Sequence, residues 1–334
     1  MKILRSHEPG GPETLTLDTI DAPEPGAGEV RVAVKAAAIN YPDVLIIQDL
    51  YQMKPPRPFA PGGEIAGVVD ALGEGVEGVS VGDRVIAVPG YGGLAEQVVI
   101  PAKSAVPLPD SHSFTDGAAM MLTYATVIHA LKDRGRLAEG EQMLVLGGAG
   151  GVGLATIELG KAMGARVVAA VSSDEKAEAA REAGADDCIV YPRGDLDRDA
   201  QKDLARQFKD AATGEGFDVV LDPVGGAYAE PALRSLGWQG RYLVVGFPAG
   251  IPAPPLNLTL LKEAEISGVF WGAFAMRDPK ANAAHVAELF KLWDDGKIAP
   301  SVTATFPLER GSDAIATLAS REAIGKIVVT INGE

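Results

Sequence analysis

The chain has 334 residues, of which 47% are apolar and 22% charged, so its length suits two domains and its composition excludes a disordered or fibrous protein. A formal net charge of -15 argues against nucleic acid and anionic membranes as partners. The single cysteine, Cys188, excludes an intrachain disulfide and a cysteine-rich zinc site. The sequence contains no secretory signal pattern and no long apolar run, so we expect a cytoplasmic protein.

Residues 1–120 are rich in Gly and Pro and contain short runs typical of β-strands. The predicted strands are residues 30–34, 65–69, 84–88 and 97–100. Turn signals such as Pro25-Gly26 and Gly82-Asp83 separate them, which indicates a small, mostly antiparallel β-domain. The Pro-rich residues 41–60 are predicted to form a loop that lies over another part of the protein.

From about residue 123, the pattern changes to alternating strands and helices. The predicted strands are 143–147, 167–171, 187–190, 217–222, 241–246 and 265–269, and the predicted helices between them are 152–163, 174–183, 199–212 and 227–236. This alternation predicts a doubly wound parallel sheet.

After residue 270 the sequence predicts a helix over 281–295 and a terminal strand over 326–331. Because this tail is too small to be a domain, we expect it to return to the first one. Residues 1–122 with 270–334 would then form one domain, and residues 123–269 would be inserted into it.

A glycine-rich segment joins the first of these predicted strands to a helix. Gly148, Gly150 and Gly153 fit the spacing G-x-G-x-x-G. Gly148 permits a tight turn, Gly150 removes a side chain where a pyrophosphate approaches, and Gly153 allows close packing of helix and strand. The helix N-terminus at Gly151 and Val152 offers N–H groups and a partial positive charge. The motif predicts dinucleotide binding, with a Gly-rich turn of an ordinary α/β protein as the alternative.

The end of the second predicted Rossmann strand indicates which dinucleotide binds. NAD sites usually carry an acidic residue there, but here an acid appears only at Asp174, at a predicted helix start. The side chains available to a 2′-phosphate are Ser172, Ser173, Lys176, Tyr191 and Arg193. Hydroxyl and cationic groups favour NADPH over NADH. The alternatives are that Ser173 only caps the helix, that Lys176 is a solvated charge, and that Asp174 reaches the ribose.

With these features in place, the chain resembles a known family. The resemblance rests on AAAINYPD (36–43), LY (50–51), PGGEIAG (61–67), VGDRV (81–85), GAGGVG (148–153) and GK (325–326). The chain is similar to zinc-independent medium-chain dehydrogenases/reductases of the NADPH:quinone oxidoreductase type. The resemblance implies an α/β fold in which a GroES-like, mostly-β catalytic domain carries an inserted Rossmann domain. It also implies an active site in the cleft between the domains, and a homodimer.

The departures from zinc-dependent relatives concern the metal ligands. Those relatives carry a Cys where Asn40 stands and a His where Gly63 stands, and they have a four-cysteine zinc lobe that is missing here. We therefore expect no metal. Without a Lewis acid to stabilise an alkoxide, an acceptor must itself be able to spread negative charge. The resemblance thus implies hydride transfer from NADPH to a quinone or an α,β-unsaturated carbonyl.

The same resemblance assigns roles to individual residues. Tyr51 matches a tyrosine of quinone reductases and enoyl-thioester reductases and is expected to donate a proton or stabilise an enolate, unless it only packs in its loop. Asn40 is expected to hold substrate, water or the nicotinamide amide, and Asp43 to orient its neighbours, unless both are structural. The residues expected near the nicotinamide or the substrate are Thr123, Gly246, Phe247, Phe270 and Trp271, with simple core packing as the alternative.

Two other functions remain open. An enoyl-thioester (acyl-CoA) reductase would need a basic surface for the charged CoA, and only Lys54 and Arg57 in the Pro-rich loop offer one. A non-catalytic NADPH-binding protein is the third hypothesis, against which the presence of Asn40, Asp43 and Tyr51 speaks. Turnover of simple quinones separates these hypotheses.

Overall fold

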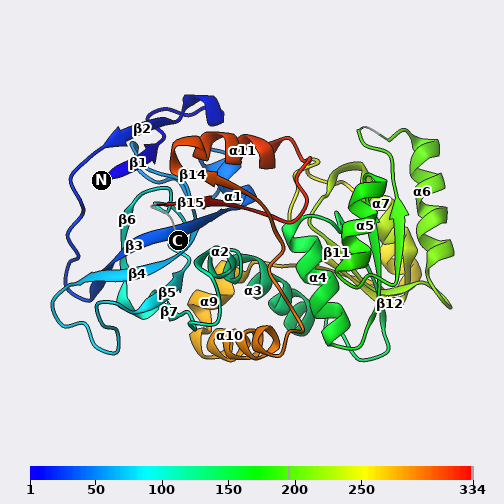
Figure 1. Ribbon diagram of the computed structural model, residues 1–334. Coiled ribbons are helices and arrows are strands. Elements are labelled where there is room, and N and C mark those ends of the chain that lie inside the picture. The colour runs from blue at the N-terminus through cyan, green and yellow to red at the C-terminus, as the bar shows by residue number, and fades with distance from the viewer. Residues whose placement is uncertain (195, 332–334) are drawn as a thin grey trace. The chain divides into compact units, whose positions relative to one another are not determined.

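The computed structural model describes residues 1–194 and 196–331 (Figure 1). They form two compact units, Met1–Leu122 together with the chain from Pro300 onward, and Thr123–Ala299. The boundary expected at residue 270 is wrong, because residues 270–299 group with the second unit. The physical reason is packing: Phe274 of α9 (Trp271–Arg277) stacks on the ring of His129, with centroids 4.1 Å apart.

The first unit is built on a mixed seven-stranded sheet in the order β14-β15-β3-β4-β5-β7, with β6 beside β3. Its strands are β3 (Glu29–Ile39), β4 (Glu64–Leu72), β5 (Arg84–Ala87), β6 (Gln97–Pro101), β7 (Val106–Pro107), β14 (Val302–Pro307) and β15 (Lys326–Thr330). β14 and β15 are parallel, and the other pairs are antiparallel. A separate antiparallel pair comprises β1 (Lys2–Arg5) and β2 (Thr16–Thr19). The four predicted strands of residues 1–120 are present, and β3 extends further than predicted because residues 36–39 are also buried.

Short helices connect the strands of this unit. They are η1 (Pro12–Thr14), α1 (Tyr41–Ile46), η2 (Ala102–Ser104), α2 (Phe114–Ala118), η5 (Leu308–Arg310) and α11 (Gly311–Ala319). Residues 41–60 were expected to be a loop throughout, but their first six residues form α1. Pro42 suits the first helical turn, and the Asp43 carboxylate accepts the Asn40 N–H at 2.8 Å, which stabilises the helix start.

The second unit contains a six-stranded sheet in the order β10-β9-β8-β11-β12-β13. Its strands are β8 (Gln142–Leu146), β9 (Arg166–Val171), β10 (Asp187–Val190), β11 (Phe217–Asp222), β12 (Leu236–Val244) and β13 (Glu265–Gly268). All neighbouring strands are parallel, which confirms the predicted doubly wound sheet. All five residues of β8 are buried, as expected of a central strand covered on both faces.

Several helices of the second unit cover this sheet (Figure 1). The helices in this part of the chain are α3 (Met121–His129), the π-helical η3 (Ala130–Arg134), α4 (Gly151–Ala162), α5 (Asp174–Glu182), α6 (Arg198–Ala211), η4 (Gly226–Tyr228), α7 (Ala229–Ser235), α8 (Asn257–Lys262), α9 and α10 (Pro279–Asp294). The four predicted crossover helices correspond to α4, α5, α6 and α7. On α6, Leu204, Ala205 and Phe208 are buried, so one face of this helix packs into the unit.

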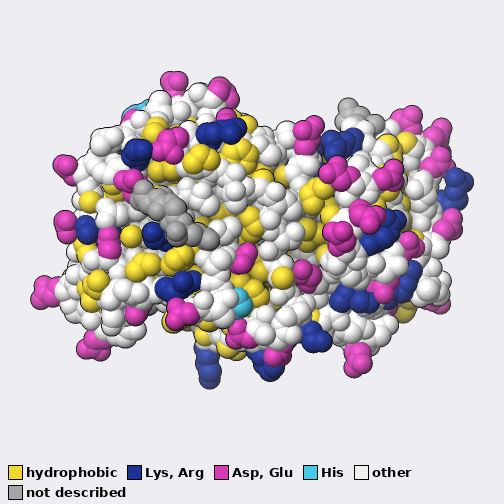
Figure 2. Space-filling model, in the orientation of Figure 1, with side chains coloured by type: hydrophobic (Ala, Val, Ile, Leu, Met, Phe, Trp, Pro, Cys, Tyr) yellow, Lys and Arg dark blue, Asp and Glu magenta, His cyan; other side chains and the backbone are white. Residues whose placement is uncertain are grey.

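Within residues 1–194 and 196–331, no helix is both long enough and apolar enough to cross a membrane. Figure 2 shows acidic side chains interspersed with lysines and arginines over the visible face.

Candidate active site

The glycine-rich segment forms a tight turn between β8 and α4. The left-handed residue of this turn is Gly147, with φ +60°, and not Gly148 as the motif had suggested. A Cβ on Gly148 would lie 2.8 Å from the Cβ of Ala169, so this glycine is needed for contact with β9. A Cβ on Gly153 would lie 2.2 Å from the Gly147 carbonyl oxygen, so α4 can approach the turn only without a side chain there.

The N-terminus of α4 fits a dinucleotide pyrophosphate. Gly150 is the N-cap residue, and a Cβ on it would meet nothing closer than the Gly147 oxygen at 3.5 Å. The first-turn N–H groups of Gly151, Val152 and Gly153 are of the kind that an α-helix leaves without intrahelical partners. Together with the helix dipole, they form a cradle for anionic oxygens.

Tyr191 lies inside the second unit. Its side chain is buried, and its ring centroid lies 4.7 Å from that of Tyr228. Burial raises the pKa of this hydroxyl well above its ordinary range. The assignment of Tyr191 to the 2′-phosphate pocket stays a prediction.

At the end of β9, the structure brings a hydroxyl and a cation together. The Arg193 Nε donates to the Ser172 Oγ at 3.2 Å. Ser173, by contrast, accepts the backbone N–H of Lys176 at 3.3 Å and so caps α5, which was the alternative considered for it. Asp174 is exposed in the first turn of that helix. The Ser172–Arg193 pair therefore has the chemistry that suits a phosphate monoester.

Asp222 organises the loop that follows β11. Its carboxylate accepts the N–H groups of Val224 and Gly225, both at 2.8 Å, and the Tyr242 hydroxyl. Burial raises the pKa of this carboxyl, and these hydrogen bonds oppose the shift. The arrangement fixes the loop at the carboxyl edge of the sheet, where ligands of doubly wound folds bind.

The loop after β12 is attached to the loop after β11. The Ala249 N–H donates to the Val224 carbonyl at 2.9 Å, and the Gly246 N–H contacts the Asp222 carbonyl at 3.4 Å. Phe247 is 46% exposed, so it is not a core residue. The exposed Phe247 side chain therefore extends from a loop whose backbone is held by these hydrogen bonds.

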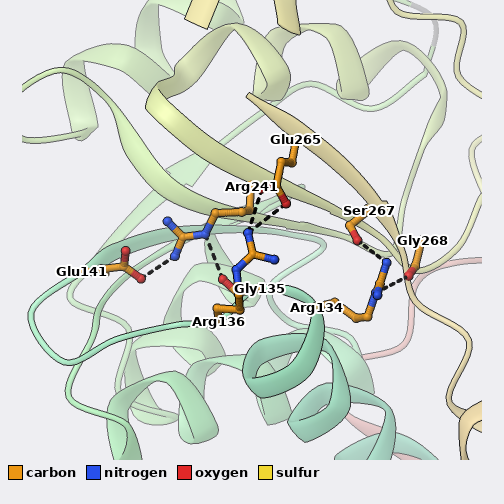
Figure 3. Close-up of polar contacts among 8 residues, drawn as sticks. All are labelled: Arg134, Gly135, Arg136, Glu141, Arg241, Glu265, Ser267 and Gly268. Atoms are coloured by element: carbon orange, nitrogen blue, oxygen red, sulfur yellow. Dashed lines mark hydrogen bonds and ion pairs between the residues drawn. The ribbon is translucent and has the colours of Figure 1, made fainter. Parts of the chain in front are cut away.

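Phe270 follows the edge strand β13, which Arg134 and Arg136 link to the end of η3, while Arg241 links β12 to the turn that follows (Figure 3). The contacts are Arg134 to the Ser267 hydroxyl and the Gly268 carbonyl, Arg136 to Glu265, and Arg241 to the Gly135 carbonyl and Glu141. Phe270 is 58% exposed, which again excludes core packing. The neighbouring Trp271 donates its indole N–H to Asn282 at 2.8 Å. Thr123, in α3, is buried.

In the first unit, Asn40 belongs to a buried polar network. Its Oδ1 accepts the Lys326 ammonium at 2.6 Å, and its Nδ2 donates to Glu64 at 3.0 Å and to the Ala38 carbonyl at 3.3 Å. A side-chain amide has two N–H donors, and both are used here. The contacts therefore leave Asn40 no donor for a substrate or a nicotinamide, and they favour a role in holding Lys326 and Glu64.

Sequence reasoning missed Glu64 and Lys326 as site residues. Both are almost fully buried, and their side chains lie 3.3 Å apart. The available signal was a charged residue at the start of each of two largely apolar strands, β4 and β15. A buried charge needs a partner, so two such charges of opposite sign are expected to meet.

Asp43 orients the backbone around this network. Its two oxygens accept the N–H groups of Asn40 and Gly62, each at 2.8 Å. Burial raises the pKa of this carboxyl to about 6, while the backbone amides and Lys326 oppose the shift. These contacts support the orienting role expected for Asp43.

Tyr51 is half-buried and packs against the apolar core of the first unit. Burial raises the pKa of its hydroxyl, and the charge of Asp43 raises it further. The phenol is therefore protonated at neutral pH and holds a proton that it can donate.

The residues at the positions of the zinc ligands do not fit zinc. Gly63 has no side chain, and the Asn40 amide oxygen faces the ammonium of Lys326. A positive charge at this distance repels a divalent cation. Within the described parts of the chain, no group of three or more His, Cys, Asp or Glu side chains is arranged to hold a metal ion.

Comparison with known proteins identifies the family. Residues 151–288 match the family described as zinc-binding dehydrogenase, and residues 26–110 match the alcohol dehydrogenase GroES-like domain. Quinone oxidoreductase-like protein 2 of Rattus norvegicus is 37% identical over 322 residues, which covers 96% of this chain and 89% of that protein. The chain belongs to the quinone oxidoreductase-like medium-chain dehydrogenases/reductases.

Solved structures of this family share the fold. The quinone oxidoreductase of Escherichia coli, complexed with NADPH, is 29% identical with a TM-score of 0.89, covering 99% of this chain and 100% of that one. The CurK enoyl reductase is 25% identical with a TM-score of 0.86, covering 99% of each chain. These neighbours confirm the GroES-like and Rossmann architecture of a quinone oxidoreductase-like protein. The match to the zinc-binding dehydrogenase family does not supply zinc ligands here. The two positions that correspond to such ligands, Asn40 and Gly63, lie outside residues 151–288.

Proposed function

We propose that the protein is an oxidoreductase that uses NADPH to reduce a quinone or an activated enone without a metal ion. The observation that carries this proposal is the Asn40–Lys326–Glu64 network, in which an ammonium faces the side chain that replaces a metal ligand. An alcohol needs a Lewis acid to stabilise its alkoxide. An electron-poor acceptor does not, because the added electron pair delocalises onto oxygen.

The second unit supports the choice of NADPH. Its residues for the pyrophosphate are the amides at the start of α4, and Ser172 with Arg193 would hold the 2′-phosphate. NADPH, when bound, supplies a hydride. The E. coli neighbour is itself an NADPH complex. We expect NADPH to bind at least about tenfold tighter than NADH, a difference of about 1.4 kcal/mol.

In the first unit, Tyr51 would supply the proton. Its hydroxyl is neutral at physiological pH and can donate to the oxygen or carbon of the acceptor that gains negative charge. Asp43 would hold the backbone at Gly62, and the Asn40 network would keep that region rigid. The acceptor then receives the elements of a hydride and a proton.

An enoyl-thioester reductase is the second candidate, because the CurK enoyl reductase shares the fold over 99% of both chains. The charge distribution argues against a CoA ester. Arg57 is engaged with Asp49 at 2.7 Å and with the Ile47 carbonyl at 2.8 Å, which leaves the exposed Lys54 as the basic group of this loop. One lysine is little for a ligand with several negative charges.

A screen of NADPH consumption tests these candidates. The acceptors are 1,4-benzoquinone, 9,10-phenanthrenequinone, a simple enone and an enoyl-CoA ester. The proposal predicts turnover of the quinones and the enone. Preferential turnover of the CoA ester would favour the second candidate, and tight NADPH binding without any turnover would indicate a non-catalytic protein.

We also propose that the protein is a homodimer, as the family resemblance implied. β13 is the last strand of its sheet, and exposed apolar side chains lie nearby in sequence at Leu256, Leu260 and Leu261. Exposed apolar surface of this kind is typical of an interface. Light scattering after size-exclusion chromatography would give the mass, and a monomer at all concentrations would reject this proposal.

A further inference from the structure

Tyr51 lies in a loop whose two ends are anchored in the core. The chain leaves the core at Ile47 and returns at Phe59, and both residues are buried in the same apolar cluster. Phe59 is also hydrogen-bonded through its backbone to Ser6, at 2.8 and 3.3 Å. Between these anchors, Leu50 is 68% exposed. The position of Tyr51 therefore depends on its own packing against the core and on the contacts that hold the loop between its ends.

Arg57 links the two ends of this loop. Its Nη2 donates to the Ile47 carbonyl at 2.8 Å, and its Nη1 pairs with Asp49 at 2.7 Å. The guanidinium also lies 5.2 Å from the centroid of the Phe59 ring. Only 16% of the Arg57 side chain is exposed, so these contacts lie in a largely buried environment. A planar fork can make them together, and a single ammonium cannot.

Arg57 pairs with Asp49, which stands two residues before Tyr51 in the chain. Asp49 has φ +58°, in the left-handed region that non-glycine residues seldom adopt. The turn around it is held by backbone bonds to α1, such as the Leu50 N–H to the Leu45 carbonyl at 2.9 Å. Without Arg57, the Asp49 carboxylate loses its partner, and the loop gains freedom two residues before Tyr51.

We propose that Arg57 is a positioning residue that holds the Tyr51 hydroxyl in place for the acceptor. The inference rests on the proposed function, because it takes Tyr51 as the group that contacts the acceptor. Because its guanidinium is engaged within the loop in this role, Arg57 is not one of the groups that would bind an anionic substrate.

A hydrogen-exchange experiment tests the structural part without any need for activity. Arg57→Met should speed amide exchange in peptides covering residues 48–53, and Arg57→Lys should do so less. The matched control is Arg31→Met, because the Arg31 side chain is also 16% exposed, pairs with Asp70 at 2.8 Å and donates to the Pro23 carbonyl at 3.2 Å. Unchanged exchange at residues 48–53 in Arg57→Met would overturn the proposal.

The functional part is tested by combining variants. Arg57→Met should lower kcat on an enone by about tenfold with little change in KM, since misplacement of a reacting group affects the chemical step. We expect Tyr51→Phe to lose more activity on enones than on quinones, and Arg57→Met should show the same pattern. The double variant, Arg57→Met with Tyr51→Phe, should be no slower than Tyr51→Phe alone. Additive losses, or equal losses on both acceptors, would contradict the proposal. A wild-type protein without turnover would reject the proposed function, while the exchange result would still decide the role of Arg57 in the loop.

Discussion

Gly150→Ala should weaken NADPH binding while leaving the fold intact. Gly150 has φ -78° and ψ 170°, which alanine adopts without strain. The added Cβ would meet only the Gly147 oxygen, at an ordinary contact distance of 3.5 Å. We therefore expect the free energy of unfolding to change by less than about 0.5 kcal/mol.

The same methyl group would occupy the open space beside the N-terminus of α4. A phosphate oxygen displaced from one amide loses a charge-assisted hydrogen bond worth about 2 kcal/mol. That loss corresponds to a rise in the NADPH Kd of roughly thirtyfold. Isothermal titration calorimetry measures the Kd, and urea unfolding followed by circular dichroism measures the stability.

Gly153→Ala provides the contrast. Its Cβ would lie 2.2 Å from the Gly147 oxygen and 2.6 Å from the Gly148 carbonyl carbon, so the backbone of the turn must move. Such overpacking costs about 1–3 kcal/mol of stability, and binding should fall with it. A Gly150→Ala protein that binds NADPH with the wild-type Kd would refute the assignment of this turn to the pyrophosphate.

Four further outcomes are expected. Tyr51→Phe should reduce kcat on enones more than on quinones, because the enolate formed by hydride addition needs a proton more than the hydroquinone monoanion does; equal kinetics would demote Tyr51 to packing. Arg193→Ala should reduce the preference for NADPH over NADH in calorimetry, by about tenfold if the 2′-phosphate loses a charge-assisted bond, while the NADH Kd stays constant. Burial raises the pKa of Asp43 from 3.8 to about 6, so its ionisation costs the folded state about 3 kcal/mol. The wild-type unfolding free energy should therefore decline as the pH rises from about 4 to about 7, and Asp43→Asn should flatten that decline in urea titrations. Dialysis against EDTA should leave turnover unchanged, and a loss restored by zinc would contradict the metal-free proposal.

Much of the second unit could be predicted from the sequence because its strands are short apolar runs bounded by glycines. The stretch that became β8 is followed directly by Gly147 and Gly148, and its apolar character reflects burial on both faces. The prediction of a loop over residues 41–60 was only partly right, because the prolines suggested irregular structure throughout this segment. The helical start at Asn40 and Asp43 was a local signal that the proline content outweighed.

The polar network could not be found in the same way. Lys326 contacts Asn40 across 286 positions of the chain. The charged residues at the starts of β4 and β15 indicate a buried ion pair, but no local pattern shows that Asn40 joins it. The family resemblance led to Asn40 through the position of a metal ligand, and its contact with this pair appears only when β15 pairs with β3. The burial of Tyr191 was not evident from the sequence for a related reason, since it depends on packing against Tyr228, 37 residues further along the chain.

The most direct test of the account follows the hydride itself. NADPH carrying deuterium at C4 of the nicotinamide, as each of the two stereoisomers, would be incubated with an α,β-unsaturated ketone and the metal-free protein. We expect one stereoisomer to transfer its deuterium to the β-carbon of the saturated product, as mass spectrometry and NMR would detect. Product without deuterium from either stereoisomer, or label transfer that requires added zinc, would contradict it.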